Sequence, residues 1–402
     1  MKSSQKFSKR IVEALRNRRE IQQWETFIVE MLEKLELSPI ERARATECYE
    51  ELGLHIARKM ELAEAEAQVF VQGSMRTQTT VSPRGRQKFD LDVVVKLSSP
   101  RLARLRDSEA FFNAFGRALE GIPAAGEPEA KRRCWRLQYP HEPFYFDVTP
   151  ALPDSLKIVE TDLRVRDPDT VWSPSNPEEF ADWFCSIAAK RFAFQTVNDV
   201  RFAEAKTDVA PLPSQPIGLH DVLRRGVQLM KLHRDNYYWD KTDRKEAMPI
   251  SVILITLAGH AYNHLVTQER TSFDTPIEAL LELVDRMPNW IRRDGREYQV
   301  LNPKLSSENF ADRWNRDDGM RAEEFGVWHL QLKDDLELLF SDNYDTRTEP
   351  RIRSVFGQFG VDAWRKASRP DALQGLLATL PGQPPSANPA APRPQASRNT
   401  LA

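Results

Sequence analysis

Cysteine, net charge and long apolar runs are all scarce in this chain of 402 residues. Its three cysteines, Cys48, Cys134 and Cys185, are widely spaced, which excludes a disulfide framework and a four-cysteine zinc site. Lysine and arginine (57) nearly balance aspartate and glutamate (59), so a net charge of −2 excludes a basic nucleic-acid coat. No apolar run approaches the roughly 18–20 residues of a membrane span, and the charged start lacks the apolar core of a secretory signal. We therefore expect a cytoplasmic protein without membrane contact.

The hydrophobic pattern predicts an α+β fold with two lobes and a cleft between them. Helical spacing covers 6–35 and, after an N-cap serine followed by proline, about 39–60. A mixed α/β part follows, with strands expected at 68–71, 89–97, 133–139, 144–148 and 158–165 and a helix at 108–119. Helical patterns dominate from about residue 177, at 178–194, 219–238, 250–265, 275–287 and 323–339. The predicted units are 1–175 with the N-terminal helices, an all-helical 176–370, and 371–402.

The last of these units is predicted to be a disordered tail. From Pro381 onward the sequence is rich in proline, alanine and serine and has no acidic or aromatic residue. Such a segment cannot bury enough apolar surface to offset the entropy lost on ordering.

The segment that indicates chemistry runs from residue 72 to residue 95, QGSMRTQTTVSPRGRQKFDLDVVV. Gly73-Ser74 follows a short strand, and glycine lets a phosphate approach the backbone while serine adds a hydroxyl. Asp90 and Asp92 lie two residues apart on the clearest strand, so both carboxylates face the same way. A separate strand carries Asp147 among apolar residues. If the two strands pair, the three acids form one site.

Three carboxylates on one face suit divalent magnesium, which prefers carboxylate, water and phosphate oxygens. Two such ions about 3.5–4 Å apart can hold the attacking and leaving oxygens of a phosphoryl displacement. Gly73-Ser74 would hold the outer phosphates of a nucleoside triphosphate. Either motif alone is weak, because Gly-Ser is an ordinary turn and Asp-x-Asp is common on solvated strand edges. The combination at this spacing, with a third acid, favours the metal site.

These motifs resemble the signature of the DNA-polymerase-β-like nucleotidyltransferases. Within that superfamily the chain is similar to the bacterial DncV-like enzymes (CD-NTases), relatives of cyclic GMP-AMP synthase that make cyclic oligonucleotide signals in the anti-phage systems called CBASS. The similarity spans about residues 40–340. Further matching segments are Gly73-Ser74 with Thr79, PFYFDVTPA around Asp147, the helix 227–235, Pro249-Ile250-Ser251, and Asn302-Pro303 with 308–314, which resembles a late helix of these enzymes.

The resemblance implies a polymerase-β-like catalytic lobe on a helical lobe, with two Mg²⁺ ions, or Mn²⁺ in their place, on Asp90, Asp92 and Asp147. It also implies that Lys231 and Ser251 contact the triphosphate. The alternatives are a surface lysine and an N-capping serine. Gln72 either touches the nucleotide or only closes its turn. The expected reaction joins nucleoside triphosphates, with ATP favoured, into a cyclic di- or trinucleotide that contains adenine.

The resemblance also bears on partners and on rival functions. Animal relatives grip double-stranded DNA through a zinc-binding insertion, and the spacing of the cysteines here does not imply a nucleic-acid activator. Some bacterial relatives occur beside ubiquitin-transfer-like proteins that join the enzyme's C-terminus to other molecules, and the tail ending in Thr400-Leu401-Ala402 would be accessible to such a partner. The rivals are a linear oligonucleotide synthase, a tRNA-end polymerase, a protein-modifying nucleotidyltransferase and a non-catalytic nucleotide-binding scaffold.

Overall fold

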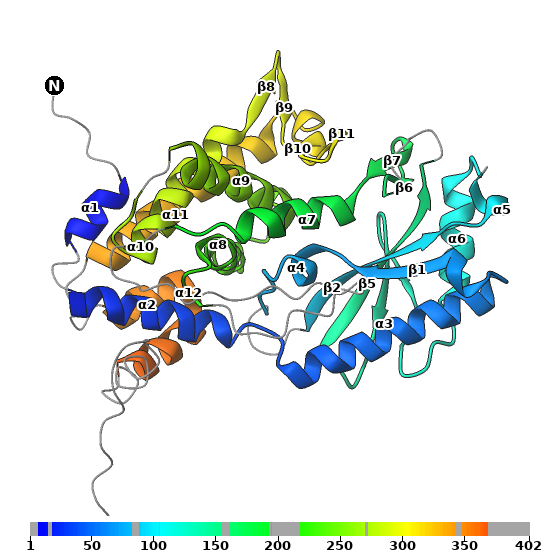
Figure 1. Cartoon of the computed structure of the whole chain (residues 1–402), viewed down its shortest axis with the longest axis horizontal. Helices are drawn as coiled ribbons and strands as arrows, with labels where there is room; N and C mark the ends of the chain where they lie inside the picture. Colours follow the sequence, from blue (N-terminus) through cyan, green and yellow to red (C-terminus); the bar gives the residue numbers. More distant parts are fainter. Residues whose placement is uncertain are drawn as a thin grey trace, which may run out of the picture.

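The computed structural model describes residues 7–14, 18–82, 88–103, 105–154, 161–192, 194, 218–269, 272–341 and 348–368. It has two lobes, a sheet lobe and a helical lobe, which lie side by side (Figure 1). The predicted tail falls outside the described residues.

A seven-stranded sheet forms the centre of the first lobe. Its order is β1-β2-β5-β4-β3, and β6 pairs with both β5 and β7. The pair β2–β5 is parallel, whereas the other pairs are antiparallel. The strand predicted at 89–97 is confirmed at both ends. The strand bounds are β1 (Ala67–Val71), β2 (Phe89–Leu97), β3 (Glu129–Ala130), β4 (Trp135–Gln138), β5 (Phe144–Pro153), β6 (Leu163–Asp167) and β7 (Val171–Ser175).

Helices of the first lobe pack against the sheet. The longest, α3 (Pro39–Lys59), begins where the sequence predicts, with a capping box in which Ser38 and Glu41 each accept the other's backbone N–H. Such caps stabilise a helix by about 1 kcal/mol. The helix packs on β1, and its buried residues join the apolar core of the sheet. The others are α4 (Gly73–Arg76), α5 (Pro100–Ala103) and α6 (Ser108–Ala118), with a 3₁₀ turn at Glu64–Glu66.

Among the residues that the structure describes, the second lobe is helical apart from two short hairpins that the pattern did not predict. The hairpins are β8 (Arg292–Asp294) with β9 (Glu297–Gln299), and β10 (Leu301–Asn302) with β11 (Leu305–Asn309). The helices are α7 (Pro177–Ala188), α8 (Val222–Tyr237), α9 (Ser251–Asn263), α10 (Pro276–Arg286), α11 (Met320–Ser341) and α12 (Thr348–Ala367). A π-helical turn follows α9 at His264–Gln268, and 3₁₀ turns lie at Lys245–Ala247, Met287–Trp290 and Asp312–Asn315.

The late helix expected over residues 308–314 is wrong. Glu308 and Asn309 close strand β11, and a 3₁₀ turn begins at Asp312. The Asn309 side chain explains the difference. Its oxygen accepts the backbone N–H groups of Val300 and Ala311, both at 3.0 Å, and its amide donates to the Tyr298 carbonyl. Side-chain bonds of this kind compete with the helical backbone pattern.

The first two helices, α1 (Phe7–Ala14) and α2 (Arg18–Glu33), pack in the core of the helical lobe. Helix α2 lies against α12, where Trp24 and Phe27 pack on Trp364 with ring centroids 4.7 and 5.4 Å apart. Helix α1 contacts α10 and α11. The sequence placed these helices with the catalytic lobe, but their apolar faces are covered by the helical one.

Glu25 on α2 should make the stability of the protein depend on pH. Burial raises the pKa of Glu25 from 4.5 to about 7, and its Oε1 has no hydrogen-bond partner. An acid whose pKa is higher in the folded state contributes stability below its unfolded pKa, and this contribution is lost as pH rises through about 7. We therefore expect Glu25→Gln to stabilise the protein by about 2 kcal/mol at pH 8 and hardly at all at pH 4. Urea denaturation at both pH values measures this difference, and the exposed control Glu246→Gln should show none. Equal effects of Glu25→Gln at both pH values would contradict the prediction.

Within the described part of the chain, no helix combines the length and apolar character that crossing a membrane requires.

Candidate functional site

A hollow of about 1210 Å³, open to solvent, lies between the two lobes and receives side chains from both. The sheet lobe contributes the end of β1, the start of α4 and the acidic face of β2. The helical lobe contributes the starts of α7 and α9, the end of α8, and the β10–β11 hairpin. Seven of the eight predicted site residues line this cleft: Gln72, Gly73, Ser74, Asp90, Asp92, Lys231 and Ser251.

The strand β2 presents Asp90 and Asp92 to the cleft. Alternation along the strand buries Phe89, Leu91 and Val93 on the opposite face, in the core of the sheet. Asp90 is exposed to the cleft and Asp92 is half-buried. The two carboxylates therefore lie on one face, as the sequence predicts.

The two carboxylates repel each other in this setting. Burial, followed by the charge of Asp147, raises the pKa of Asp90 from 3.8 to about 6. Burial, followed by the charges of Asp90 and Asp147, raises the pKa of Asp92 to about 7. Arg136 and Lys231 oppose these shifts. A divalent cation between the carboxylates would remove the repulsion.

Asp147, the third predicted acid, lies on the neighbouring strand β5. The parallel register pairs it directly with Asp92, so the sheet brings the acids onto one face. Its two carboxylate oxygens accept a bidentate pair from Arg136 on β4, at 2.8 and 2.7 Å. The Arg136 guanidinium also lies 4.1 Å from the centroid of the Tyr145 ring. Asp147 is thus held beside the cleft and does not line it.

The residues present fit a magnesium ion in part. Asp90 and Asp92 supply paired carboxylate oxygens, the ligands that Mg²⁺ prefers, on one face of a strand. Across the described ranges, no three His, Cys, Asp or Glu side chains form a group that could hold a metal ion. Both carboxylate oxygens of Asp147 are bonded to Arg136. Two of the predicted ligands therefore fit the ion, and the third is engaged by an arginine.

Gly73 brings the start of α4 against the acids. Its backbone has φ +62°, in the left-handed region that glycine adopts without strain. A methyl group added there would lie 2.2 Å from Oδ2 of Asp92. The backbone N–H of Gln72 donates to the Asp92 carbonyl at 3.0 Å, and the Gln72 side chain does not cap α4. Gly73 therefore brings the backbone at the start of α4 against the Asp92 carboxylate, and the phosphate contact of Gly73-Ser74 stays a prediction.

Helix α8 forms hydrogen bonds to the segment that follows α4. Arg224, Gln228 and Lys231 lie on one face of the helix at spacings of four and three residues. Each donates a hydrogen bond to a backbone carbonyl of the segment 77–80, to residues 77, 80 and 79 respectively, at 3.0, 3.1 and 2.8 Å. The helical lobe thereby fixes the position of the loop that leaves Ser74.

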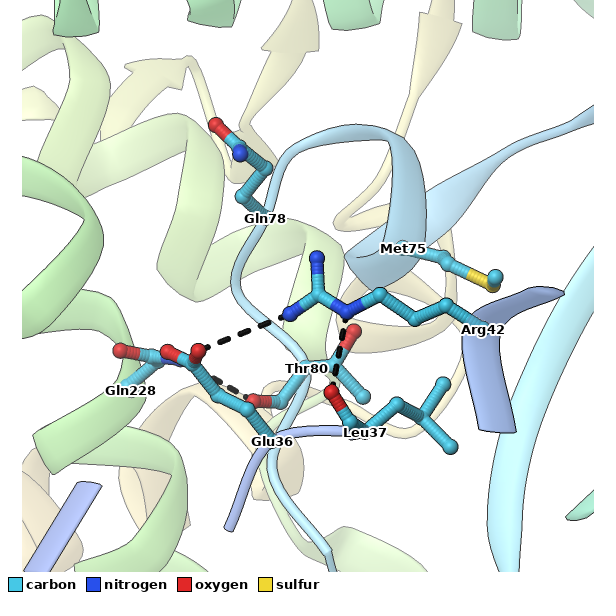
Figure 2. Close-up of a pocket in the computed structure, with 7 residues that line it drawn as sticks. All are labelled: Glu36, Leu37, Arg42, Met75, Gln78, Thr80 and Gln228. Atoms are coloured by element: carbon cyan, nitrogen blue, oxygen red, sulfur yellow. Dashed lines mark hydrogen bonds and ion pairs between the residues drawn. The ribbon is translucent and has the colours of Figure 1, made fainter. Parts of the chain in front are cut away.

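The same face of α8 also holds the turn between α2 and α3 (Figure 2). Gln228 donates to Glu36 at 3.0 Å, and Glu36 pairs with Arg42 at 3.6 Å. The fully buried Arg225 donates to the same carboxylate at 2.7 Å. A buried arginine with its carboxylate is costly to break, because removal of one partner leaves the other charge unpaired. This network ties the N-terminal helices to the loop at Thr80.

The positions of Lys231 and Ser251 exclude the simple structural alternatives. Lys231 is 6% exposed, so it is no surface lysine. Burial, followed by Arg234, lowers the pKa of Lys231 from 10.5 to about 8. Ser251 is the first residue of α9 and not its N-cap, which is Ile250, and its hydroxyl accepts a hydrogen bond from Arg234 at 3.0 Å. Both side chains line the cleft opposite the acids.

Several residues of the cleft were not predicted from the sequence. Arg136 is a neighbour of Asp147 only through the β4–β5 register, and that pairing has no signal in a single sequence. Tyr145 lines the cleft and hydrogen bonds to Asp90. It lies two residues before Asp147 on the same face of β5 and pairs in register with Asp90, which is visible only once β2 and β5 are paired. Glu308 and Phe310 lie in the segment expected to be helical, so the sequence did not predict that they line the cleft.

Known proteins share this architecture and these segments. A family model described as "Cyclic GMP-AMP synthase DncV-like, nucleotidyltransferase domain" matches residues 67–150, which contain the three acids. A c-di-GMP synthase of Roseivirga ehrenbergii is 30% identical over 295 residues, which make up 73% of this chain and 73% of the relative.

Solved structures match over most of the chain. The CD-NTase CdnG of Bradyrhizobium diazoefficiens, solved in complex with GTP, has a TM-score of 0.64 at 24% identity and covers 88% of this chain and 99% of its own. CdnC of E. coli MS115-1, in a CdnC:HORMA-deltaN complex, has a TM-score of 0.56 at 12% identity and covers 83% and 97%. These two establish the likeness of fold, and the 30% identical relative establishes the family. The chain therefore belongs to the DncV-like nucleotidyltransferases, the CD-NTases, and is a nucleotidyltransferase enzyme.

Proposed function

We propose that this nucleotidyltransferase joins ribonucleoside triphosphates into a cyclic oligonucleotide and releases pyrophosphate. The observation that carries the proposal is the juxtaposition, across one cleft, of paired carboxylates and a phosphate-binding set. Asp90 and Asp92 face the cleft from the sheet, with Gly73-Ser74 beside them and Lys231 opposite.

Each side chain has a proposed role that follows from its chemistry. Ser74 and the backbone at Gly73 bind the outer phosphates of the donor nucleotide. Lys231, a compact positive charge, donates hydrogen bonds to the triphosphate, either in place of its bond to the Thr79 carbonyl or in addition to it. Ser251 adds a hydroxyl from the helical lobe, and Gln72 borders the same phosphates. The protein positions the reactants and neutralises charge, which is the main source of catalysis in such transfers.

In each joining step a ribose hydroxyl of one nucleotide attacks the α-phosphorus of another. The new bond is between the hydroxyl oxygen and the α-phosphorus. The bond between the α-phosphorus and the bridging oxygen breaks, pyrophosphate leaves, and the hydroxyl proton passes to solvent or to a nearby carboxylate. A second attack by the other end of the linear intermediate closes the ring.

A divalent metal would complete the site. Asp90 and Asp92 fit Mg²⁺, or Mn²⁺, and Asp147 is the proposed third ligand, in exchange for its Arg136 pair. The metal supplies Lewis-acid stabilisation of the charge that develops on the phosphate oxygens. The protein residues supply the carboxylates, held on one face of the sheet.

The bases and the ring size are the finer part of the proposal. The sequence predicts a cyclic di- or trinucleotide with adenine, and this stays a prediction. The 30% identical relative is named a c-di-GMP synthase, which supports a cyclic dinucleotide and favours guanine. A role in anti-phage signalling, and an accessory partner acting on the chain, stay proposals. The complex of CdnC with HORMA-deltaN supports the existence of partners in the family.

The test is an incubation of the purified full chain with Mg²⁺ and all four labelled ribonucleoside triphosphates. Products are treated with phosphatase and resolved by chromatography and mass spectrometry. We expect a phosphatase-resistant product with the mass of a cyclic di- or trinucleotide, absent from the Asp90→Asn/Asp92→Asn double variant. A product whose terminal phosphates are removed by phosphatase would mean a linear synthase. The same phosphatase-resistant product from the double variant would refute the proposed site.

A further inference from the structure

The end of the cleft formed by the β10–β11 hairpin contains a carboxylate that no step of the transfer uses. Glu308, on β11, lines the cleft together with Asn302 and Phe310 of the same hairpin. Ser175, at the end of β7, and Phe180, on α7, line it from the neighbouring elements. The proposed phosphate-binding residues come from other elements, namely the starts of α4 and α9 and the end of α8. This part of the cleft therefore suits the base of a nucleotide better than its phosphates.

Glu308 is held rigidly by its neighbours. Its Oε2 accepts a hydrogen bond from the Asn302 amide at 2.7 Å and one from the backbone N–H of Asn176 at 3.3 Å. Asn302 is 2% exposed, and its amide orientation is fixed because its oxygen accepts the Lys304 N–H at 2.9 Å. The Ser175 hydroxyl also hydrogen bonds to the Glu308 carboxylate.

The carboxylate keeps hydrogen-bonding capacity for a ligand. An ionised carboxylate has about four acceptor sites, and three protein donors leave about one of them open. No Lys, Arg or His among the described residues forms an ion pair with Glu308; burial raises its pKa, and the charge of Arg133 opposes this only weakly. A half-buried carboxylate that has no ion-pair partner gains most from a ligand that brings hydrogen-bond donors. A ligand at this point should therefore donate a hydrogen bond to Glu308.

Ser175 places a second acceptor next to the first. Because its hydroxyl proton bonds to Glu308, the lone pairs of its oxygen are available to the cleft. Two adjacent acceptors match two adjacent donors. Among the four bases only guanine has two neighbouring donors, N1–H and the 2-amino group, on its pairing edge. Adenine and cytosine place a ring-nitrogen acceptor beside their amino group, and uracil has a single N–H between two carbonyls.

The walls around this pair are apolar and partly aromatic. Phe310 and Phe180 pack edge to face with centroids 5.4 Å apart, and Val252 and Ile255 of α9 also line the cleft. Such walls contact the faces of a planar base without regard to its identity, so selection falls to the polar pair.

We propose that Glu308, with Ser175 beside it, selects guanine in one base subsite of the cleft by accepting hydrogen bonds from its N1–H and 2-amino groups. This inference rests on the proposed function and names the substrate base of the same site. Adenine in this subsite would satisfy at most one of the two acceptors with its amino group and would place its N1 acceptor against the other. A site built to accept hydrogen bonds strongly rejects a ligand that lacks the donors.

The test measures binding without turnover. The full chain is titrated calorimetrically with the non-hydrolysable α,β-methylene analogues of GTP, ATP and inosine triphosphate, in Mg²⁺. We expect the order GTP over inosine triphosphate over ATP, since inosine keeps N1–H but lacks the 2-amino group. Glu308→Gln should weaken the binding of the GTP analogue by about 10- to 100-fold and change the affinity for the ATP analogue by less than about 3-fold. The control Glu297→Gln, an exposed acid on the neighbouring β9, should change neither.

A second variant keeps the test decisive if Glu308→Gln does not fold. Ser175→Ala removes the partner of the 2-amino group, together with one hydrogen bond to Glu308, so the GTP analogue should then bind no better than the inosine analogue. A wild-type preference for ATP, or a GTP preference that survives in whichever variant folds, would overturn the inference. Failure of the proposed function is a separate result: the product assay would then yield no cyclic product, while the order of binding would still report on Glu308.

Discussion

Asp92→Asn should abolish nucleotide joining and yet give a more stable protein in the absence of metal. The carboxylate is half-buried beside Asp90 and is paired in register with Asp147. Loss of a single preorganised charge-stabilising group costs about 10²–10³ in rate in other enzymes. Because Asp92 is one of the two cleft carboxylates that would hold the metal, we expect a loss of at least about 10³-fold in product formation.

The stability change follows from the pKa of Asp92. Its value in the folded protein is about 7, against 3.8 for an unperturbed carboxyl, because of burial and the charges of Asp90 and Asp147. Stability from an acid with a raised pKa is fully present below pH 3.8 and is lost as pH rises through about 7. Asparagine carries no such charge. We therefore expect Asp92→Asn to stabilise the protein by about 1–2 kcal/mol at pH 8 in EDTA, after allowance for the water that screens the open cleft.

Addition of Mg²⁺ should reverse the order of stability. A ligand that binds only the folded state stabilises it by mass action, so the melting temperature of the wild type should rise with Mg²⁺ while that of Asp92→Asn stays nearly constant. Melting curves at pH 8 with EDTA and with increasing Mg²⁺ measure both effects. A wild type more stable than Asp92→Asn in EDTA would contradict the repulsion between the acids. A melting temperature independent of Mg²⁺ in both proteins would contradict the metal site.

The acid-bearing strand was predictable from sequence because local rules decide it. Alternation of apolar and polar residues over 89–97 places Leu91 and Val93 in the core, and the same period places Asp90 and Asp92 together on the other face. The start of α3 was predictable for the same reason, since Ser38 and its capping partner are three residues apart. Each of these features depends on contacts within a few residues.

Features that depend on distant contacts were not predictable. The Arg136–Asp147 pair requires the β4–β5 register, and nothing in a single sequence states which strands are neighbours. The segment 308–314 was expected to be helical because it resembles a late helix of the related enzymes, whereas Glu308 and Asn309 close β11. The side chain of Asn309 stabilises the observed conformation by bonding to the backbone on both sides of it. The part of the cleft proposed to bind a base was therefore not predictable from the sequence, whereas the part proposed to bind metal was.

Gly73→Ala should be nearly as damaging as loss of an acid, although it removes no functional group. The added methyl group would lie 2.2 Å from Oδ2 of Asp92 and 3.0 Å from its Cγ, which is closer than real contacts allow. Either the carboxylate turns away or α4 moves with Ser74. Both displace groups that we propose to act on the phosphates, and misplacement by about 1 Å can cost about 10²-fold in rate. We expect product formation to fall by about 10²-fold or more.

A matched substitution separates this clash from backbone strain. Gly73 has φ +62°, and Gly295, in the exposed turn between β8 and β9, has φ +59° with no atom within 4 Å of an added methyl group. A left-handed alanine costs about 1–2 kcal/mol at either position. Gly295→Ala should therefore lower stability to a similar extent and leave product formation unchanged. If Gly73→Ala were as active as Gly295→Ala, the close approach of the α4 backbone to Asp92 would not matter for the reaction. A selective loss in Gly73→Ala, with equal stability of the two variants, would tie activity to the distance between α4 and the Asp92 carboxylate.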